Sequence, residues 1–278
     1  MRRLRVSGQR RLMLRFFETP SSDPYVSITM DVNLEPALEF LDAFEREQGE
    51  RAGVQHLVTA AVARCLHEFP ALNVKIVGGA FYQLERVDVA VPVSLGSKGS
   101  GQDQTGMMVL HGVEKKTLKE IARETRARTR AERSGKLDGF GSAFGRRFAQ
   151  SLPRAAEAAV DLAGTVLRHP VGYRLLGPWS SVSTGVTNVG AVFELPTGAR
   201  FRSVSLTLPS RLGHVASAFA LAPACDAPVA EERRVVVRRV LPIMMVVDHR
   251  AIDGHLMAKL GERLAAALLA PAELARQA

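Results

Sequence analysis

Two hydrophobic periodicities follow one another at the start of the folded part of the chain. Residues 25–32 (YVSITMDV) alternate apolar and polar side chains and are rich in β-favouring residues, which predicts a strand. Apolar residues at helical spacing predict a helix over 34–49, with Pro36 in its first turn, and a second helix over 54–69 that ends at Pro70. We expect the second helix to pack on a sheet.

The next stretch predicts a hairpin, two further strands and a charged helix. Gly78-Gly79 separates two short β-favouring runs, an arrangement typical of a tight hairpin turn. Residues 96–106 are rich in Gly, Ser and Gln, so they are expected to form a loop. The elements predicted around these two features are hairpin strands over 74–77 and 81–84, strands over 87–93 and 107–110, and a helix over 115–133.

The second half of the chain is mostly β, after one insertion of helical character. Residues 137–180 interleave apolar and Arg residues at helical spacing. Three interpretations fit this pattern: an amphipathic helix packed on its own domain, a lid over an apolar substrate, or a helix lying on a membrane surface. Beyond it we predict strands over 182–193, 201–208, 214–221 and 234–248, and a closing helix over 256–269.

Length and composition indicate one globular domain. The chain has 278 residues, of which 46% are hydrophobic and 23% charged, so a sizeable core can form without disulfides or metal. We expect a basic N-terminal arm over 1–24 and a single domain over 25–278. Cys65 and Cys225 stand far apart without ligand partners at metal-site spacing, which favours a reducing, cytoplasmic location and no metal. No apolar run is long enough to span a bilayer.

The residues at the end of the predicted strand 234–248 carry the strongest chemical signal. The strand runs directly into Asp248-His249-Arg250-Ala251-Ile252-Asp253-Gly254, so an imidazole stands where a buried sheet meets a helix. Its neighbours can orient the ring of His249 and leave one nitrogen free to accept a proton. The pattern therefore predicts a general base. The alternative is a hydrogen-bonded histidine at a strand end with no catalytic role.

This segment resembles the HxxxDG signature of chloramphenicol acetyltransferase and, in its DHRxxDG form, of the catalytic domain of the dihydrolipoamide acyltransferases of 2-oxo acid dehydrogenase complexes. Further segments resemble the same family and occur in its order. They are ITMDVNLEPALEFL, LVTAAVARCLHEFPALNVKI, VDVAVPVS, KKTLKEIARETRAR, GVTNVG and VLPIMMVVDHRAIDG, followed by the closing helix. The resemblance covers roughly residues 25–136 and 181–275.

The resemblance implies a fold and a mechanism. The implied fold is an α/β, chloramphenicol acetyltransferase-like two-layer sandwich, with a mixed sheet flanked by helices and a helical insertion. His249 matches the base that deprotonates a thiol or hydroxyl before it attacks an acyl thioester. Thr187, in GVTNVG, matches the hydroxyl that stabilises the tetrahedral oxyanion. Asp253 matches a residue that supports the site through an Arg contact, and Gly254 is expected to allow a tight turn.

The resemblance also implies partners. Coenzyme A or acyl-CoA is the expected co-substrate, and relatives form trimers with the active site between subunits. The net charge of +9 suits a polyanionic co-substrate, whereas the basic residues match no nucleic-acid motif, so we expect no nucleic-acid partner. The chain carries no lipoyl domain in this sequence, so a lipoyl group would come from a partner protein, or the acceptor is a different thiol, alcohol or amine.

Two other functions remain open at this point. The chain could be a catalytically inactive subunit that assembles with a larger acyltransferase, or a peripheral membrane acyltransferase that uses the insertion as its anchor. Among the other histidines, His56 and His67 fall in a predicted helix and are expected to be structural. His214 and His255 are less easily dismissed, and His255 directly follows the motif.

Overall fold

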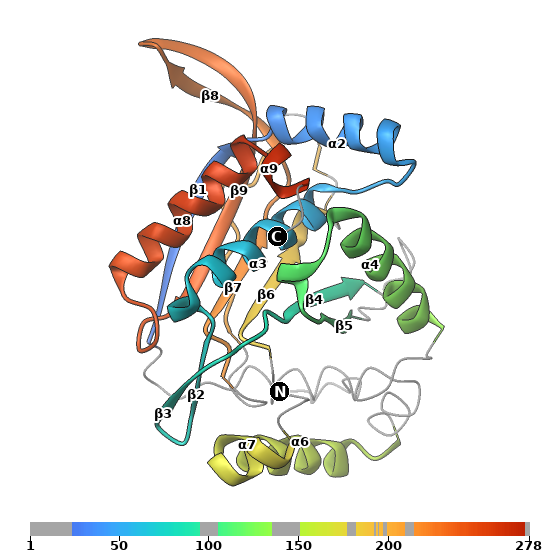
Figure 1. The fold of residues 1–278 in the computed structure, drawn as a ribbon, viewed down its shortest axis with the longest axis vertical. Coiled ribbons are helices and arrows are strands. Elements are labelled where there is room, and N and C mark those ends of the chain that lie inside the picture. Colours follow the sequence, from blue (N-terminus) through green and yellow to red (C-terminus); the bar gives the residue numbers. More distant parts are fainter. Residues whose placement is uncertain are drawn as a thin grey trace, which may run out of the picture.

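The computed structural model describes residues 24–94, 105–134, 151–176, 182–191, 193, 195–196, 199–208 and 214–275. A seven-stranded mixed sheet forms the centre, in the order β1-β9-β7-β6-β4-β5, with β8 paired to β9 (Figure 1). The strands are β1 (Tyr25–Asn33), β4 (Val89–Ser94), β5 (Thr105–Leu110), β6 (Thr184–Asn188), β7 (Ser217–Leu221), β8 (Cys225–Glu231) and β9 (Arg234–Asp248), and β2 (Val74–Val77) and β3 (Ala80–Gln83) form a separate hairpin.

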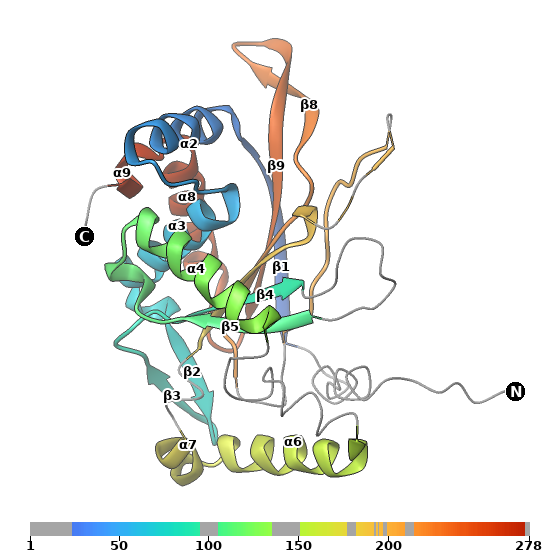
Figure 2. The ribbon, with the colours of Figure 1, turned by 90° about the vertical axis from the view of Figure 1, so that its right-hand side faces the viewer.

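One face of the sheet is covered by helices, which makes the two layers of the fold (Figure 2). The covering helices are α2 (Glu35–Gln48), α3 (Val54–Glu68), α4 (Leu118–Arg133) and α8 (Gly254–Leu269), and the short α9 (Ala272–Ala275) ends the described chain. The α/β two-layer fold expected from the sequence is therefore confirmed, and the hairpin at Gly78-Gly79 and helices α2 and α3 lie where the pattern predicted them.

The core between these layers follows from the helical spacing of apolar residues. In α2 the buried residues Ala37, Leu41 and Phe44 lie on one face of the helix. In α3 most of the residues from Leu57 to Leu66 are buried, because this helix lies centrally between the sheet and its neighbours. These side chains join those of β9, such as Ile243 and Met245, in one large cluster.

The opposite face of the sheet is covered by an extended segment that corrects one prediction. Residues 201–208 were expected to form a strand, but they have no strand pairing in the structure. Their alternation has another cause: Val204, Leu206 and Leu208 pack with Ala220 and other side chains of β7 and β9 in a second, smaller cluster. The period of two thus reflects one-sided burial of an extended segment without hydrogen-bonded strand pairing.

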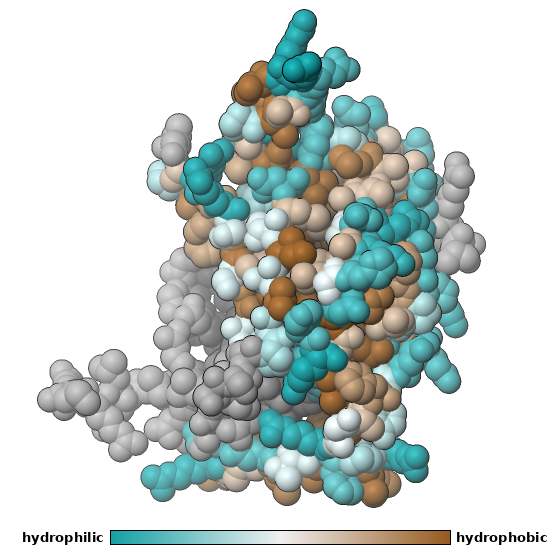
Figure 3. All heavy atoms as spheres, turned by 90° about the vertical axis from the view of Figure 1, so that its left-hand side faces the viewer, coloured by the Kyte–Doolittle hydropathy of each residue, from teal (hydrophilic) through white to brown (hydrophobic). Residues whose placement is uncertain are grey.

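The structure adds one strand that the sequence did not suggest. Strand β8 contains Pro228 and pairs with β9 alone, so it is an edge strand, where a missing backbone N–H is tolerated. Together β8 and the first half of β9 form a hairpin that projects beyond the body of the molecule (Figures 1 and 3). The predicted N-terminal arm lies outside the described residues apart from position 24, as does most of the predicted loop 96–106.

The described part of the insertion consists of two helices, α6 (Pro153–Arg168) and α7 (Pro170–Leu176), below the β2–β3 hairpin in Figures 1 and 2. The ring of Tyr173 in α7 lies 5.8 Å from the ring of Tyr82, and the Lys75 ammonium lies 5.8 Å from the Tyr173 ring centre. Helix α7 therefore packs on the hairpin. No helix in the described part of the chain combines the length and hydrophobicity needed to cross a membrane.

Candidate active site

His249 follows the last residue of β9 and is exposed at the end of the sheet. Its backbone N–H donates to the Pro24 carbonyl oxygen at 2.7 Å, which fixes the chain there. The Nδ1 atom of its ring lies 3.0 Å from the carbonyl oxygen of Ile252. Because a carbonyl oxygen only accepts, Nδ1 carries the proton and Nε2 keeps its lone pair. No described residue hydrogen-bonds to Nε2, so this nitrogen is available to accept a proton.

Asp248, to which the sequence pattern assigned no role, anchors this turn. Its side chain is fully buried, and its carboxylate accepts hydrogen bonds from His214 Nε2 at 2.9 Å and from Arg250 Nε and a terminal guanidinium nitrogen. Burial alone would raise the pKa of Asp248, but the hydrogen bonds from His214 and Arg250 outweigh it and leave the pKa well below its usual value. Asp248 is therefore a buried carboxylate next to the candidate base.

Asp253 and Gly254 begin α8. The Asp253 carboxylate accepts a hydrogen bond from the Leu256 backbone N–H at 2.9 Å and so caps the helix. In the described part of the chain no Arg forms an ion pair with Asp253, so the expected Arg contact stays a prediction. The tight turn expected at Gly254 is wrong: its φ is not left-handed, and a Cβ added there meets no atom within 4 Å.

Thr187 lies on β6, and the strand register separates it from His249. Thr187 pairs with Ala220 of β7, and Ala220 pairs with Met244 of β9, five residues before His249. Two strand spacings and five residues along a strand amount to about 20 Å. Within one copy of the chain, these two side chains cannot reach the same carbonyl group.

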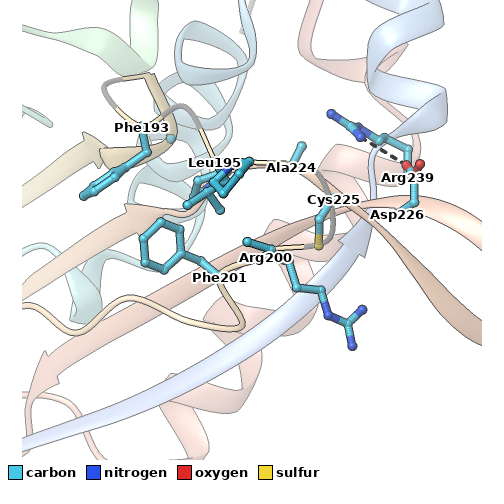
Figure 4. Close-up of a pocket in the computed structure, with 12 residues that line it drawn as sticks. Phe193, Leu195, Arg200, Phe201, Ala224, Cys225, Asp226 and Arg239 are labelled. Carbon is cyan, nitrogen blue, oxygen red and sulfur yellow. Dashed lines mark hydrogen bonds and ion pairs between the residues drawn. The ribbon is translucent and has the colours of Figure 1, made fainter.

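A hollow of about 790 Å³ lies beyond the end of β6 (Figure 4). One wall is formed where Gly190 meets Pro223: a Cβ on Gly190 would stand 2.8 Å from the Pro223 α-carbon, so only glycine fits without displacing backbone. The other described residues that line the hollow are Phe193, Leu195, Pro196, Ala199, Arg200, Phe201, Ala224, Cys225, Asp226 and Arg239. It combines aromatic and aliphatic walls with two guanidinium groups.

The structure also places the other histidines that the sequence singled out. His56 is structural, as expected, since its Nδ1 accepts from the Gly53 N–H at 2.9 Å at the start of α3. His67 and His255 are exposed on helices. In the described ranges, no cluster of three or more His, Cys, Asp or Glu side chains is arranged to hold a metal ion.

Comparison with known proteins identifies the fold. The structure resembles that of Azotobacter vinelandii dihydrolipoamide acetyltransferase, with 16% identity, coverage of 99% of this chain and 93% of that one, and a TM-score of 0.68. That enzyme was studied for the role of a serine, a histidine and an asparagine in its catalytic mechanism. It also resembles the cubic core of the pyruvate dehydrogenase multienzyme complex, with 17% identity, coverage of 99% of this chain and 93% of that one, and a TM-score of 0.67. For chloramphenicol acetyltransferase the identity is 19%, the coverage is 94% of each chain, and the TM-score is 0.52.

A search among curated protein sequences gives no match. The sequence profile described as 2-oxoacid dehydrogenases acyltransferase (catalytic domain) matches residues 1–140 and 217–276. The match includes His249 and Asp253, whereas Thr187 and the insertion helices lie in the unmatched stretch 141–216. Since the profile covers well over half of the sequence, the chain belongs to the 2-oxoacid dehydrogenase acyltransferase catalytic-domain family.

Proposed function

We propose that this chain transfers an acyl group between coenzyme A and a thiol, hydroxyl or amine acceptor, with His249 as the general base. The observation that carries the proposal is the hydrogen bond from His249 Nδ1 to Ile252, which leaves Nε2 as a proton acceptor on an exposed ring. The histidine and the asparagine studied in the catalytic mechanism of the Azotobacter enzyme are four positions apart, as are His249 and Asp253.

The proposed reaction follows from this tautomer. His249 Nε2 takes the proton of the acceptor while the acceptor's sulfur, oxygen or nitrogen forms a bond to the thioester carbonyl carbon. The carbonyl oxygen becomes an oxyanion in the tetrahedral intermediate. When the carbon–sulfur bond breaks, the thiolate of coenzyme A leaves and takes the proton back from the imidazolium. The Ile252 carbonyl holds the Nδ1 proton throughout and keeps the ring oriented.

Thr187 is proposed to stabilise the oxyanion from a neighbouring copy of the chain. The 20 Å estimated between it and His249 in one copy requires that the two groups meet across an interface, with the hydroxyl of one copy facing the imidazole of another. A homotrimer, as in relatives, is the proposed assembly. One hydroxyl donor to an oxyanion typically accelerates the reaction by about 10²- to 10³-fold.

The β8–β9 hairpin supports self-association. Val235 and Val237 are 78% and 70% exposed, and they stand two residues apart and hence on the same face of the strand. A projecting two-stranded hairpin is marginally stable alone, and its apolar side chains and free edge favour a partner. We assign that partner to a second copy of this chain.

The surface beside Thr187 suits the substrates. The hollow after β6 has the phenyl rings of Phe193 and Phe201 in edge-to-face contact at 4.9 Å, which suits an apolar acyl or acceptor group. Arg200 and the overall charge of +9 suit the phosphates of coenzyme A. The acceptor could be a lipoyl group on a partner protein. Cys65 and Cys225 are both free thiols, in keeping with a cytoplasmic location.

The proposal is tested by following free thiol release from a panel of acyl-CoAs with candidate acceptors. We expect His249→Ala to lower kcat by about 10²- to 10⁴-fold, because the acceptor then loses its base. His67→Ala is the matched control, since this exposed histidine lies on α3 and takes no part in the site. Equal rates for wild type and His249→Ala would remove His249 from the mechanism.

A different outcome would support the assembly alternative. If wild type turns over no acyl-CoA and calorimetry detects no acyl-CoA binding, the proposed activity is wrong. Copurification of the chain with another acyltransferase under those conditions would identify it as a non-catalytic subunit.

A further inference from the structure

His214 stands just before β7, and its buried ring makes two directional hydrogen bonds. The backbone N–H of Ile76 in β2 donates to Nδ1 at 3.0 Å, and Nε2 lies 2.9 Å from a carboxylate oxygen of Asp248. A backbone N–H only donates, so Nδ1 is unprotonated and Nε2 donates its proton to Asp248. The two bonds therefore hold His214 in one tautomer, and its side chain is only 9% exposed.

Asp248 passes this constraint to the catalytic turn. Its backbone carbonyl oxygen accepts from the N–H groups of Ala251 and Ile252, each at 2.9 Å. Its Oδ1 also accepts from the Arg250 backbone N–H at 2.9 Å, and its Oδ2 accepts from the Arg250 guanidinium as well as from His214. The carboxylate is therefore held by two side chains, and the turn from 248 to 252 is built around it.

The turn then sets the state of His249. The Ile252 carbonyl that accepts from His249 Nδ1 belongs to the residue whose N–H is bonded to Asp248. A shift of Asp248 would move Ile252, release Nδ1 and let the ring exchange tautomers or rotate. If the proton of His249 moves to Nε2, that nitrogen can no longer take the proton of the incoming thiol, hydroxyl or amine.

We propose that His214 is a positioning residue for His249. It acts through Asp248 and touches neither substrate, and it ties the β2–β3 hairpin to the catalytic turn. The inference rests on the proposed function for its kinetic part, whereas the tautomers it requires are properties of the folded chain alone. The side chain at 214 must accept on one side and donate on the other across one small ring, which imidazole and, to a good approximation, a Gln amide can do.

The first measurement determines the tautomers of the wild-type chain directly. Histidine-selective ¹⁵N labelling of wild type, with long-range ¹H–¹⁵N correlation spectra, reports the tautomer of each ring. We expect the Nε2–H form for His214 and the Nδ1–H form for His249, assigned by comparison with His214→Gln and His249→Ala spectra. An Nδ1–H form at His214, or an Nε2–H form at His249, would overturn the proposal.

The second measurement compares two replacements. His214→Met keeps the volume of the side chain but makes neither hydrogen bond, whereas His214→Gln can make both. We expect Met to lower kcat by roughly 10- to 100-fold with KM changed by less than about threefold, by analogy with the losses that follow removal of groups that orient metal-bound histidines. The same variant should show mixed tautomers at His249. Gln should restore most of kcat and the single tautomer.

The outcomes separate the inference from the proposed function. If wild type is inactive with every acyl-CoA, the proposed function fails, and the tautomer spectra still decide the positioning role. If wild type is active but folded His214→Met keeps its kcat and a single His249 tautomer, the positioning role is wrong. His67→Ala serves as the control in both experiments, and thermal unfolding of each variant identifies any that does not fold. If Met does not fold, the wild-type spectra and His214→Gln kinetics decide, and a Gln variant without activity would count against the proposal.

Discussion

Two inactive variants of this chain should restore each other's activity when they assemble together. The His249→Ala chain keeps the Thr187 hydroxyl, and the Thr187→Ala chain keeps the imidazole. The register from Thr187 through Ala220 to Met244 puts the two groups about 20 Å apart in one copy, far beyond the few ångströms over which both must act on one carbonyl. Under the proposed mechanism, each working site therefore takes its two groups from different copies.

The size of the recovery follows from this arrangement. In a closed ring, each site takes its imidazole from one copy and its hydroxyl from the next, so random 1:1 mixing places two intact groups together at about one site in four. Before purification the mixture should reach about a quarter of wild-type activity, whatever the number of copies in the ring, whereas each variant alone is reduced by about 100-fold or more. Purification through two tags removes assemblies of a single variant, and every mixed trimer has one intact site, so the purified trimer should reach about a third of wild-type activity.

The assay requires mixing before assembly. The two variants carry different affinity tags, are coexpressed, and are purified through both tags in turn, after which thiol release from acyl-CoA is followed. Variants that are purified separately and mixed afterwards provide the control for subunit exchange. Doubly tagged assemblies no more active than the mean of the single variants would show that the two groups do not act together across an interface.

Three further predictions concern stability and assembly. Asp248→Asn should lower the free energy of unfolding at pH 7 by about 1–3 kcal/mol, since buried hydrogen bonds to a charged group are lost. Because the folded pKa of Asp248 is depressed, its contribution is present above about pH 4 and lost as pH falls further, so chemical denaturation should show a shallower acid dependence in the variant. Burial lowers the pKa of Lys75 to about 8, although Asp88 opposes the shift. Wild type should therefore gain up to about 3 kcal/mol in free energy of unfolding as pH rises from 8 to 10, because the unfolded chain still binds the proton that the folded chain has lost. Lys75→Met should lack that gain in the same measurement. Replacing Val235 and Val237 together by Glu should convert the assembly to smaller species in light scattering while circular dichroism stays unchanged; an intact assembly would show that the hairpin is not the interface.

The elements that the sequence predicted well are those fixed by local preferences. Gly78 and Gly79 both adopt positive φ, 57° and 78°, which is the requirement of the hairpin turn that their sequence suggested. Helix α3 ends before Pro70, which cannot donate a backbone hydrogen bond and restricts the residue before it. Each of these features depends on residues close together in the chain, so a single sequence contains the information.

The elements that the sequence predicted badly depend on what lies beside them. The alternation in 201–208 is real, but whether an alternating segment becomes a strand depends on a neighbour with free backbone groups, and this one only covers the sheet with side chains. Strand β8 was missed because Pro228 argues against a strand in the middle of a sheet and not against one at its edge. Edge position is a property of the whole topology.

The candidate site also combines features that depend on nearby residues with features that depend on distant ones. His249 could be proposed as the base from the sequence because its motif is continuous. The hydrogen bonds behind its turn join Ile76, His214 and Asp248, which are not close together in the chain. A buried carboxylate after a run of apolar residues was the available signal, since a buried charge requires partners. The pairing of the Thr187 hydroxyl with His249 is harder still to predict, because the proposed site brings them together only across an interface. Under the proposed mechanism the two groups of the site act together only in an assembly, and the exposed valines of the β8–β9 hairpin form its interface, so loss of the interface and loss of either group should each lower turnover.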